Sequence, residues 1–179
     1  MRLALALLIA LTTACTTTTT VSGTAVSTTT SSGGGRAPGG AIELTLRRSD
    51  GAFLEVGELR GQVVLLFVLA TFDAMSQMAL TPLRAIAEAY PETAIVGVAA
   101  QPSARLLVEA YESALEPPFP ITYDPQEMVA EGESMLGEIE GVPTFIVLDR
   151  RGREVARHVG FADEARLAEL LAAAGATRR

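Results

Sequence analysis

Cysteine is almost absent from this 179-residue chain, whose single thiol is that of Cys15 near the N-terminus. Residues 16–179 contain no sulfhydryl group at all. An internal disulfide, a cycling dithiol and a peroxidatic thiolate each need a cysteine in the folded domain, so all three are excluded there. Any domain that follows Cys15 must therefore work without a thiol of its own.

Lysine is also missing, and all fourteen positively charged side chains are arginines. This excludes Schiff-base and lysine-base chemistry. The formal net charge of −7 argues against binding to nucleic acid and against electrostatic adhesion to anionic lipid. The sequence has no phosphate-binding loop, no glycine-rich dinucleotide fingerprint and no zinc-ligand spacing. We therefore expect no cofactor.

The first fifteen residues resemble a bacterial lipoprotein signal. Arg2 supplies a positive start, residues 3–11 form an apolar run too short to span a bilayer stably, and Cys15 follows small residues. The resemblance implies that a signal peptide of residues 1–14 is removed and that Cys15 is acylated. Two or three acyl chains would then anchor the protein at a membrane surface of the cell envelope, facing the periplasm. A plain secretory signal with an unrelated Cys15 is the alternative.

Residues 15–40 are interpreted as the lipidated cysteine followed by a tether. Residues 16–40 are rich in threonine, serine and glycine and hold almost no apolar bulk, so they cannot offset the entropy of folding. We expect a disordered segment of about 25 residues with a root-mean-square reach of roughly 25–30 Å.

The pattern of residues 41–175 predicts one domain with several strands, followed by a tail at 176–179. The strongest strand signal is "QVVLLFVLA", a continuous apolar run of the kind that is buried on both faces of a parallel sheet. The last strands should form a hairpin whose turn spans Asp149 to Gly152. Other strands are expected within residues 41–46, 51–61, 93–100 and 116–125.

Helical spacing recurs between these strands. One helix is expected from Met75 to Tyr90 with an interruption at Pro82, because proline disrupts a helix interior. Another covers residues 103–115. A third, capped by Asp124, should run to about Leu136, and a last helix starts after Asp163 as N-cap. Strands that alternate with helices and end in an antiparallel hairpin predict an α/β sandwich with a mixed sheet.

Two segments resemble the membrane-tethered thioredoxin-like proteins of the TlpA/ResA and redoxin type. They are "VVLLFVLATF", followed at once by a helix, and "GVPTFIVLDRRGREVARHVG" near the end. In the second, Gly141-Val142-Pro143-Thr144 resembles the cis-proline segment of that family. The resemblance implies a thioredoxin-like three-layer sandwich, a mixed central sheet flanked by helices, with a cis bond at Val142-Pro143. An ordinary proline at a strand start is the alternative.

The chain departs from the family where the two active-site cysteines belong. An aromatic residue precedes the first cysteine in the family, so Phe72 places the two positions at Asp73 and Ser76. Counting back from the helix proline instead gives Ala74 and Gln77. Neither register contains a cysteine, which implies a degenerate active site.

Asp73 keeps an anion at the start of a helix, where free N–H groups and the helix dipole favour negative charge. The favoured interpretation is a simple N-cap worth ~1 kcal/mol. A general acid or base would need a perturbed pKa and a positioned partner, and none is evident. His158, the only histidine, is interpreted as a residue on the sheet surface.

Met75 and Met78 suggest one further hypothesis. Thioethers three residues apart on a helix are soft ligands that suit copper(I). Relatives in the wider fold that handle copper use cysteines and a histidine that are missing here. Two methionines at this spacing are more often core filler, which is the interpretation we favour.

Two functions remain after these exclusions. The first is a redox-inactive binding module that holds an envelope protein or other extended polypeptide beside Pro143 by backbone hydrogen bonds, as family members do. Its expected contact residues are Phe72, Asp73, Ser76, Val142, Pro143 and Thr144. The second is an oxidoreductase with a borrowed thiol or metal, or another reaction built on Asp73. The binding module is favoured, and enzymatic activity is not expected.

Overall fold

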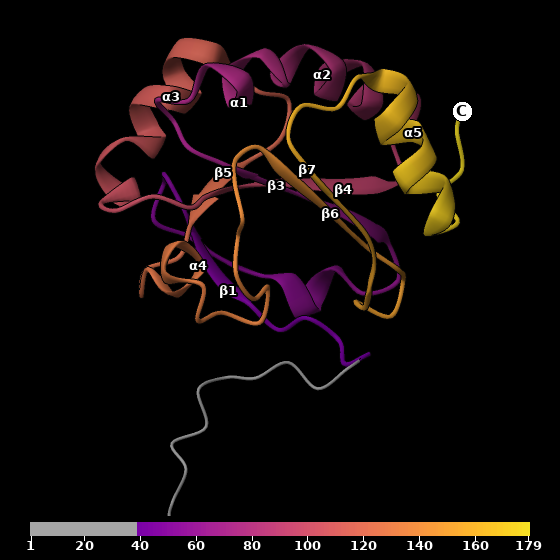
Figure 1. Cartoon of the computed structure of the whole chain (residues 1–179), viewed down its shortest axis with the longest axis horizontal. Coiled ribbons are helices and arrows are strands. Elements are labelled where there is room, and N and C mark those ends of the chain that lie inside the picture. The colour runs from indigo at the N-terminus through magenta and orange to yellow at the C-terminus, as the bar shows by residue number, and fades with distance from the viewer. Residues whose placement is uncertain (1–38) are drawn as a thin grey trace, which may run out of the picture. The chain divides into compact units, whose positions relative to one another are not determined.

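A twisted sheet runs through the middle of the folded domain, with helices on both of its faces (Figure 1). This computed structural model describes residues 39–179. The predicted signal peptide, Cys15 and almost all of the predicted tether lie outside the described residues. No helix within residues 39–179 is long and apolar enough to cross a membrane.

The sheet has seven strands in the order β2-β1-β5-β4-β3-β6-β7. The strands are β1 (Thr45–Arg48), β2 (Phe53–Glu55), β3 (Val63–Leu69), β4 (Thr93–Ala99), β5 (Ile121–Tyr123), β6 (Thr144–Leu148) and β7 (Glu154–Val159). The helices are α1 (Ala74–Met78), α2 (Leu80–Ala89), α3 (Val108–Leu115), α4 (Met128–Glu131) and α5 (Glu164–Ala173), with short 3-10 turns η1 (Val56–Leu59) and η2 (Ala104–Leu106). β3 pairs with β4 in parallel and with β6 antiparallel, so the sheet is mixed as predicted.

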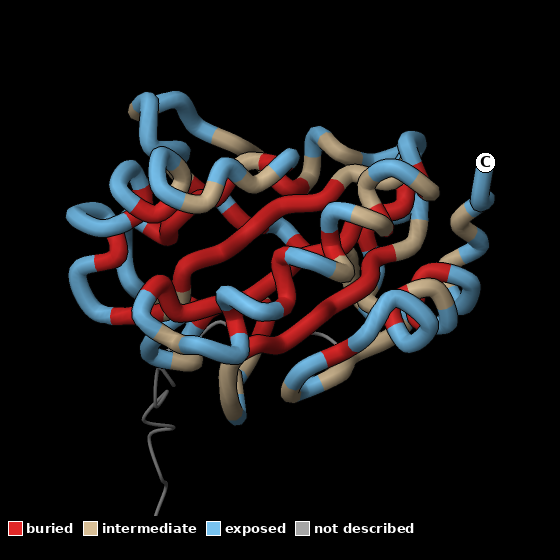
Figure 2. The backbone as a smooth tube through the Cα atoms, turned by 90° about the horizontal axis from the view of Figure 1, so that it is seen from above, coloured by how far each residue is buried: buried red, intermediate tan, exposed pale blue. Residues whose placement is uncertain are grey.

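Every residue of β3 is buried, because its apolar run must be covered on both faces. Alternate side chains point to opposite faces of a strand. Leu65 and Phe67 accordingly point to one face and pack in one hydrophobic cluster. Leu66 and Val68 point to the other face and pack in a second cluster. Figure 2 shows these central strands as buried segments beneath an exposed surface.

The two clusters define three layers. Leu83 of α2, Tyr111 of α3 and Leu167 of α5 pack against one face of the sheet. Ile42, which precedes β1, and Val129 of α4 pack against the other face. Figure 1 shows the same division, with α1, α2, α3 and α5 on one side and α4 on the other. The predicted three-layer α/β sandwich is confirmed.

The predicted helix from Met75 to Tyr90 is broken, but at Ala79 and not at Pro82. Ala79 is both the last cap of α1 and the first cap of α2. A proline has no N–H, and its ring clashes with the carbonyl four residues earlier. Pro82 therefore acts on the turn before it, which displaces the break toward the N-terminus.

The helix predicted from Asp124 to about Leu136 is much shorter than expected. Asp124 is not the N-cap of α4, which is Glu127, but its carboxylate accepts hydrogen bonds from the N–H groups of Gln126 at 2.9 Å and of Val129, inside α4, at 3.0 Å. However, α4 ends at Glu131, because Gly132 takes a φ of 75°. A left-handed glycine stops an α-helix at this point.

Three other predictions concern the first strand, the last hairpin and the last helix of the domain. Within residues 41–46, Ile42 and Leu46 are fully buried, as the alternation predicts, but regular pairing begins only at Thr45. The predicted hairpin turn is confirmed, because the N–H of Gly152 donates to the carbonyl of Asp149 at 2.8 Å. Asp163 is confirmed as the N-cap of α5.

Candidate functional site

The loop that leads to α1 and the Val142-Pro143 peptide lie at the same end of the two neighbouring strands β3 and β6. The loop that leads to α1 leaves directly from the end of β3, and Pro143 immediately precedes β6. Val68 of β3 pairs with Thr144 of β6, so Pro143 lies beside the end of β3. The Val142-Pro143 bond is cis, as the resemblance implies. The carbonyl of Pro143 accepts a hydrogen bond from the N–H of Gly160 at 2.8 Å, which ties this segment to the end of β7.

Asp73 is the N-cap of α1, with extended backbone angles of −84° and 124°. Its Oδ2 accepts one hydrogen bond from the N–H of Ser76 at 2.7 Å and a second from the Oγ of Ser76 at 2.8 Å. Ser76 has no exposed surface. Because its hydroxyl is buried and already donates to a carboxylate, Ser76 cannot meet a substrate as a nucleophile.

The second register, Ala74 and Gln77, has a different environment. Both residues are exposed on α1. The side-chain amide of Gln77 donates to the carbonyl of Thr71 at 3.0 Å, which holds it against the loop after β3. The structure thus places Asp73 and Ser76 in contact with each other, and Ala74 and Gln77 at the surface.

Val142 has backbone groups that the fold does not use. It is partly buried, and within residues 39–179 neither its N–H nor its C=O makes a hydrogen bond. By contrast, the Oγ1 of the neighbouring Thr144 donates to the carbonyl of Gly141 at 2.6 Å. A free donor and a free acceptor on one residue are the groups that a strand-like peptide pairs with.

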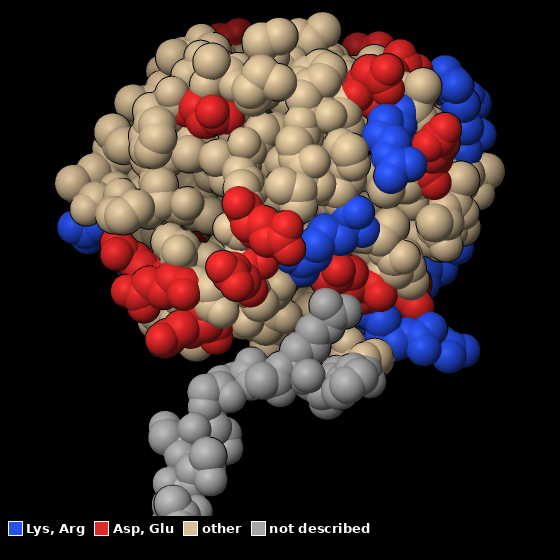
Figure 3. All heavy atoms as spheres, in the orientation of Figure 1, with Lys and Arg blue, Asp and Glu red and all other residues tan. Residues whose placement is uncertain are grey.

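Three apolar side chains project from the same region. Phe72 is 74% exposed, Met78 58% and Met75 42%. The interpretation of the two methionines as core filler is therefore wrong, because the face of α1 that carries them is not covered, whereas Ser76 is buried. The surface over α1 and α3 is mostly uncharged, whereas acidic groups and arginines gather elsewhere (Figure 3). This surface suits an apolar partner better than a charged one.

Metal binding has little support from the ligands at hand. Met75 and Met78 supply only two thioethers, and soft metal sites in proteins use thiolates or imidazoles as well. Within the described part of the chain, no group of three or more histidine, cysteine, aspartate or glutamate residues is arranged to hold a metal ion. The copper hypothesis thus rests on the methionine spacing alone.

His158 lies on β7, paired with Phe145 of β6. Its ring stacks on that of Phe145 at a centroid distance of 6.3 Å, and its Nε2 lies 3.1 Å from the carbonyl oxygen of Phe161. These contacts fit a partly buried residue at the sheet surface.

Sequence reasoning missed a buried polar pair beneath the site. Gln101 follows β4, and its side chain meets Thr71, which follows β3. Its Oε1 accepts from the N–H of Thr71 at 2.5 Å, and its Nε2 donates to the Oγ1 of Thr71 at 2.9 Å. The two residues are thirty positions apart, and only the parallel pairing of β3 with β4 brings them together. No local sequence signal marks this pair.

Tyr111 of α3 was also missed, because its helical spacing reads as that of an ordinary core residue. Its hydroxyl is buried and has no hydrogen-bond partner within the described residues. Burial, and to a smaller extent the negative charge of Asp73, raise the pKa of Tyr111 to about 12. The phenol of Tyr111 is therefore a neutral, unpaired donor near the start of α1.

No protein-family model and no curated protein sequence matches the chain. Solved structures do match it. One is described as a putative thiol:disulfide interchange protein DsbE from Chlorobium tepidum; it is 20% identical, with a TM-score of 0.60, and the match covers 76% of this chain and 96% of that one.

Two further solved structures have the same similarity. StoA from Bacillus subtilis is 17% identical with a TM-score of 0.59, over 75% of this chain and 99% of that one. The pneumococcal exposed lipoprotein thioredoxin from Streptococcus pneumoniae is 19% identical with a TM-score of 0.60, over 73% of this chain and 98% of that one. At these identities the similarity establishes the fold and not the activity. The domain therefore has the thioredoxin-like fold, which it shares with these solved structures.

Proposed function

We propose that this protein is a thioredoxin-fold lipoprotein of the bacterial envelope that binds a polypeptide beside Pro143 and carries out no thiol chemistry. The observation that carries the proposal is the backbone of Val142 next to the cis bond, whose N–H and C=O make no hydrogen bond within residues 39–179. The domain has no cysteine with which to attack a bound disulfide. What such a site retains is the ability to hold an extended chain.

The geometry defines the chemistry of the partner. Pairing with Val142 requires an extended segment that offers one backbone acceptor and one backbone donor. The exposed Phe72 and Met75 flank the start of α1 and favour apolar side chains in that segment. The partner is therefore an unfolded or strand-like stretch of an envelope protein with apolar residues, and not a charged peptide.

Localisation in the envelope follows from the N-terminal signal predicted by the sequence. One similar structure is named as an exposed lipoprotein, which supports that prediction. The folded chain begins with Ile42 in the layer opposite to α1 and α2.

The proposal is tested with a photo-crosslinking phenylalanine analogue in place of Phe72 in the full chain, in intact cells. Phe53 of β2, which is 62% exposed at the other end of the sheet, is the matched control position. We expect a discrete protein adduct from position 72, none from position 53, and weaker crosslinking when Pro143→Ala alters the neighbouring peptide. Equal adducts from both positions would overturn the proposal.

The alternative is an oxidoreductase that borrows a thiol or uses another mechanism. Its support is the printed description of the DsbE-like structure as a thiol:disulfide interchange protein. It predicts that the full chain accelerates reduction of an insulin disulfide by dithiothreitol. Turnover in that assay would replace the binding proposal with this one.

A further inference from the structure

A concavity lies between the loop after β3 and helix α3, with Phe72 in its lining. Its volume is about 360 Å³. It is lined by Thr71, Phe72, Gln77, Leu107, Ala110, Tyr111, Ala114 and Leu115. No lining residue carries a formal charge, and most are apolar. Pockets of roughly 300–1,000 Å³ with apolar walls and few polar groups are typical small-molecule sites.

Tyr111 gives this groove an unsatisfied hydrogen-bond donor. The side chain is only 5% exposed, and its hydroxyl has no partner among the described residues. A buried donor without an acceptor costs about 1–3 kcal/mol of stability. The other polar groups at the groove are already engaged, since Thr71 bonds with Gln101 and the Gln77 amide donates to the Thr71 carbonyl. Tyr111 is the exception.

We propose that this groove binds a neutral, mainly apolar small molecule whose carbonyl or ether oxygen accepts the hydrogen bond of the Tyr111 hydroxyl. The apolar walls from Leu107 and Leu115 hold the body of the ligand. The phenol fixes its orientation, because among the described residues no other buried side-chain donor at the groove is unpaired.

The electrostatics of the groove select against charged ligands. The carboxylate of Asp73 is near enough to disfavour ionisation of Tyr111, so an anion at the hydroxyl would meet the same repulsion. A cation would lose its hydration among lining residues that are uncharged and mostly apolar. The neutral phenol therefore favours an uncharged hydrogen-bond acceptor.

The Tyr111 hydroxyl is covered, whereas Phe72, which lines the same groove, is 74% exposed. A ligand in the groove therefore reaches the phenol when a side chain that covers it moves. The groove shares Phe72 with the proposed polypeptide site but does not include Val142, so binding of a small molecule there does not require a bound polypeptide.

The test uses three probes of matched shape in NMR titrations of the ¹⁵N-labelled full chain. Acetophenone carries the acceptor, ethylbenzene lacks it, and benzoate replaces it with a charge. Each probe is added up to about 1 mM, the range in which weak fragments bind. The shifts of amides in α3 and the Thr71-Phe72 loop report occupancy of the groove.

We expect acetophenone to bind about three- to tenfold more tightly than ethylbenzene, the value of one hydrogen bond. Tyr111→Phe should abolish that preference while both probes still bind, because only the hydroxyl is lost. Ala110→Leu should weaken both probes equally by filling the groove. Benzoate should bind least.

Three outcomes would overturn the proposal: no shift with acetophenone, an unchanged preference in Tyr111→Phe, or tighter binding of benzoate. None of these involves a polypeptide, so failure here would leave the crosslinking result at position 72 unaffected. Conversely, loss of the crosslink would not alter the probe titrations.

Discussion

Ser76 donates both its backbone N–H and its hydroxyl to one oxygen of Asp73, at 2.7 and 2.8 Å. The pair closes the first turn of α1 directly behind the end of β3. Since Ser76 is fully buried, its hydroxyl has no access to water as an alternative acceptor. Asp73 therefore acts on the helix in two ways, as its N-cap and as the acceptor that satisfies a buried hydroxyl.

Asp73→Ala should lower the free energy of unfolding by about 2 kcal/mol. About half of that is the lost cap, and the rest is the cost of a buried hydroxyl without its acceptor. Urea unfolding of the full chain measures the change. Asp73→Ala/Ser76→Ala should recover part of the loss, because it removes the orphaned hydroxyl.

Asp163→Ala is the matched control for that variant. Asp163 caps α5 through the N–H of Arg166 at 2.8 Å and accepts from no buried hydroxyl. Its loss should cost about 1 kcal/mol. If Asp73→Ala costs no more than Asp163→Ala, the bond from the Ser76 hydroxyl contributes nothing.

Local signals explain what the sequence predicts of the fold. The apolar run of β3 and the turn from Asp149 to Gly152 each depend on neighbouring residues, so both are readable without the structure. The end of α4 is different, because helical spacing continues past Gly132 and only its left-handed backbone stops the helix. The break before Pro82 shows the same limit, since the clash acts on the preceding turn and not on the proline itself.

The residues of the candidate site likewise differ in whether local sequence predicts them. Asp73 is predictable as a cap because capping is a local event. Tyr111 and Gln101 are not, since they reach the site only through the packing of α3 and the pairing of β3 with β4. The exposure of Met75 and Met78 was predicted wrongly, because spacing shows which residues share a helix face but not whether that face is covered.

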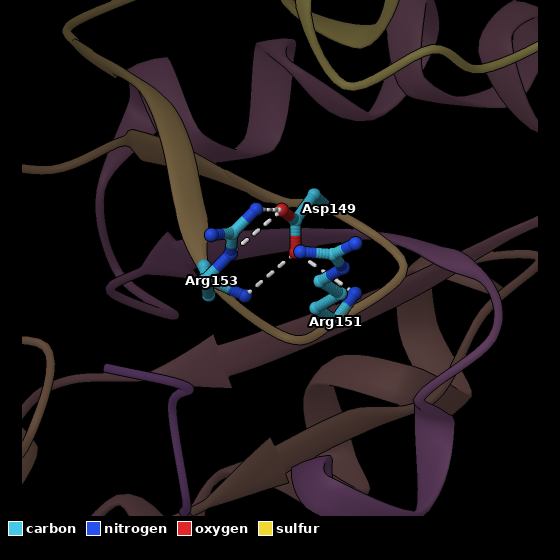
Figure 4. A network of polar contacts seen from close by, with 3 residues as sticks. All are labelled: Asp149, Arg151 and Arg153. Atoms are coloured by element: carbon cyan, nitrogen blue, oxygen red, sulfur yellow. Dashed lines mark hydrogen bonds and ion pairs between the residues drawn. The ribbon is translucent and has the colours of Figure 1, made fainter. Parts of the chain in front are cut away.

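Asp149 makes the free energy of unfolding depend on pH in the acidic range. Burial on its own would raise the pKa of this carboxyl, but the side chain and N–H of Arg153 and the N–H of Arg151 donate to it and hold its pKa below the ordinary value (Figure 4). A lowered pKa contributes stability that is present above about pH 4 and is lost as the pH falls further.

Asp149→Asn should therefore unfold at lower urea concentration than the wild type at pH 7, and the difference should shrink below about pH 4. Asp50→Asn is the control, because the Asp50 carboxylate lies in another hairpin turn in an exposed ion pair with Arg48 at 3.5 Å. That control should change little at either pH. A constant difference for Asp149→Asn from pH 7 to pH 3 would contradict the prediction.

Tyr111 makes the free energy of unfolding depend on pH in the alkaline range. Its pKa of about 12 exceeds the ordinary value, so the folded state keeps the phenol protonated while the unfolded state ionises. The stability due to this difference is fully present below about pH 10 and is lost as the pH rises toward 12. The chain has no lysine and no thiol in the domain to titrate in the same range.

Tyr111→Phe should lose less stability than the wild type between pH 9 and about pH 11. At pH 7 it should be at least as stable, because the hydroxyl that it removes has no partner. Urea midpoints across this range measure both effects, and the remaining tyrosines are common to both proteins. A lower midpoint for Tyr111→Phe at pH 7 would show that the hydroxyl has an acceptor after all.

Replacing the capping pair by sulfur should restore thiol chemistry. In a Cys15→Ser background, Asp73→Cys/Ser76→Cys puts one thiol at the partly exposed N-cap and the other in the buried first turn. The free N–H of residue 76 and the helix dipole should hold the pKa of the first thiol below about 8.5, which makes it a nucleophile at neutral pH. We expect this variant to form an internal disulfide when it is oxidised, and to catalyse the reduction of insulin by dithiothreitol.

Ala74→Cys/Gln77→Cys provides the comparison, because both positions are exposed and neither is the N-cap. Activity in the first variant alone would assign the register to Asp73 and Ser76, whereas activity in the second alone would assign it to Ala74 and Gln77.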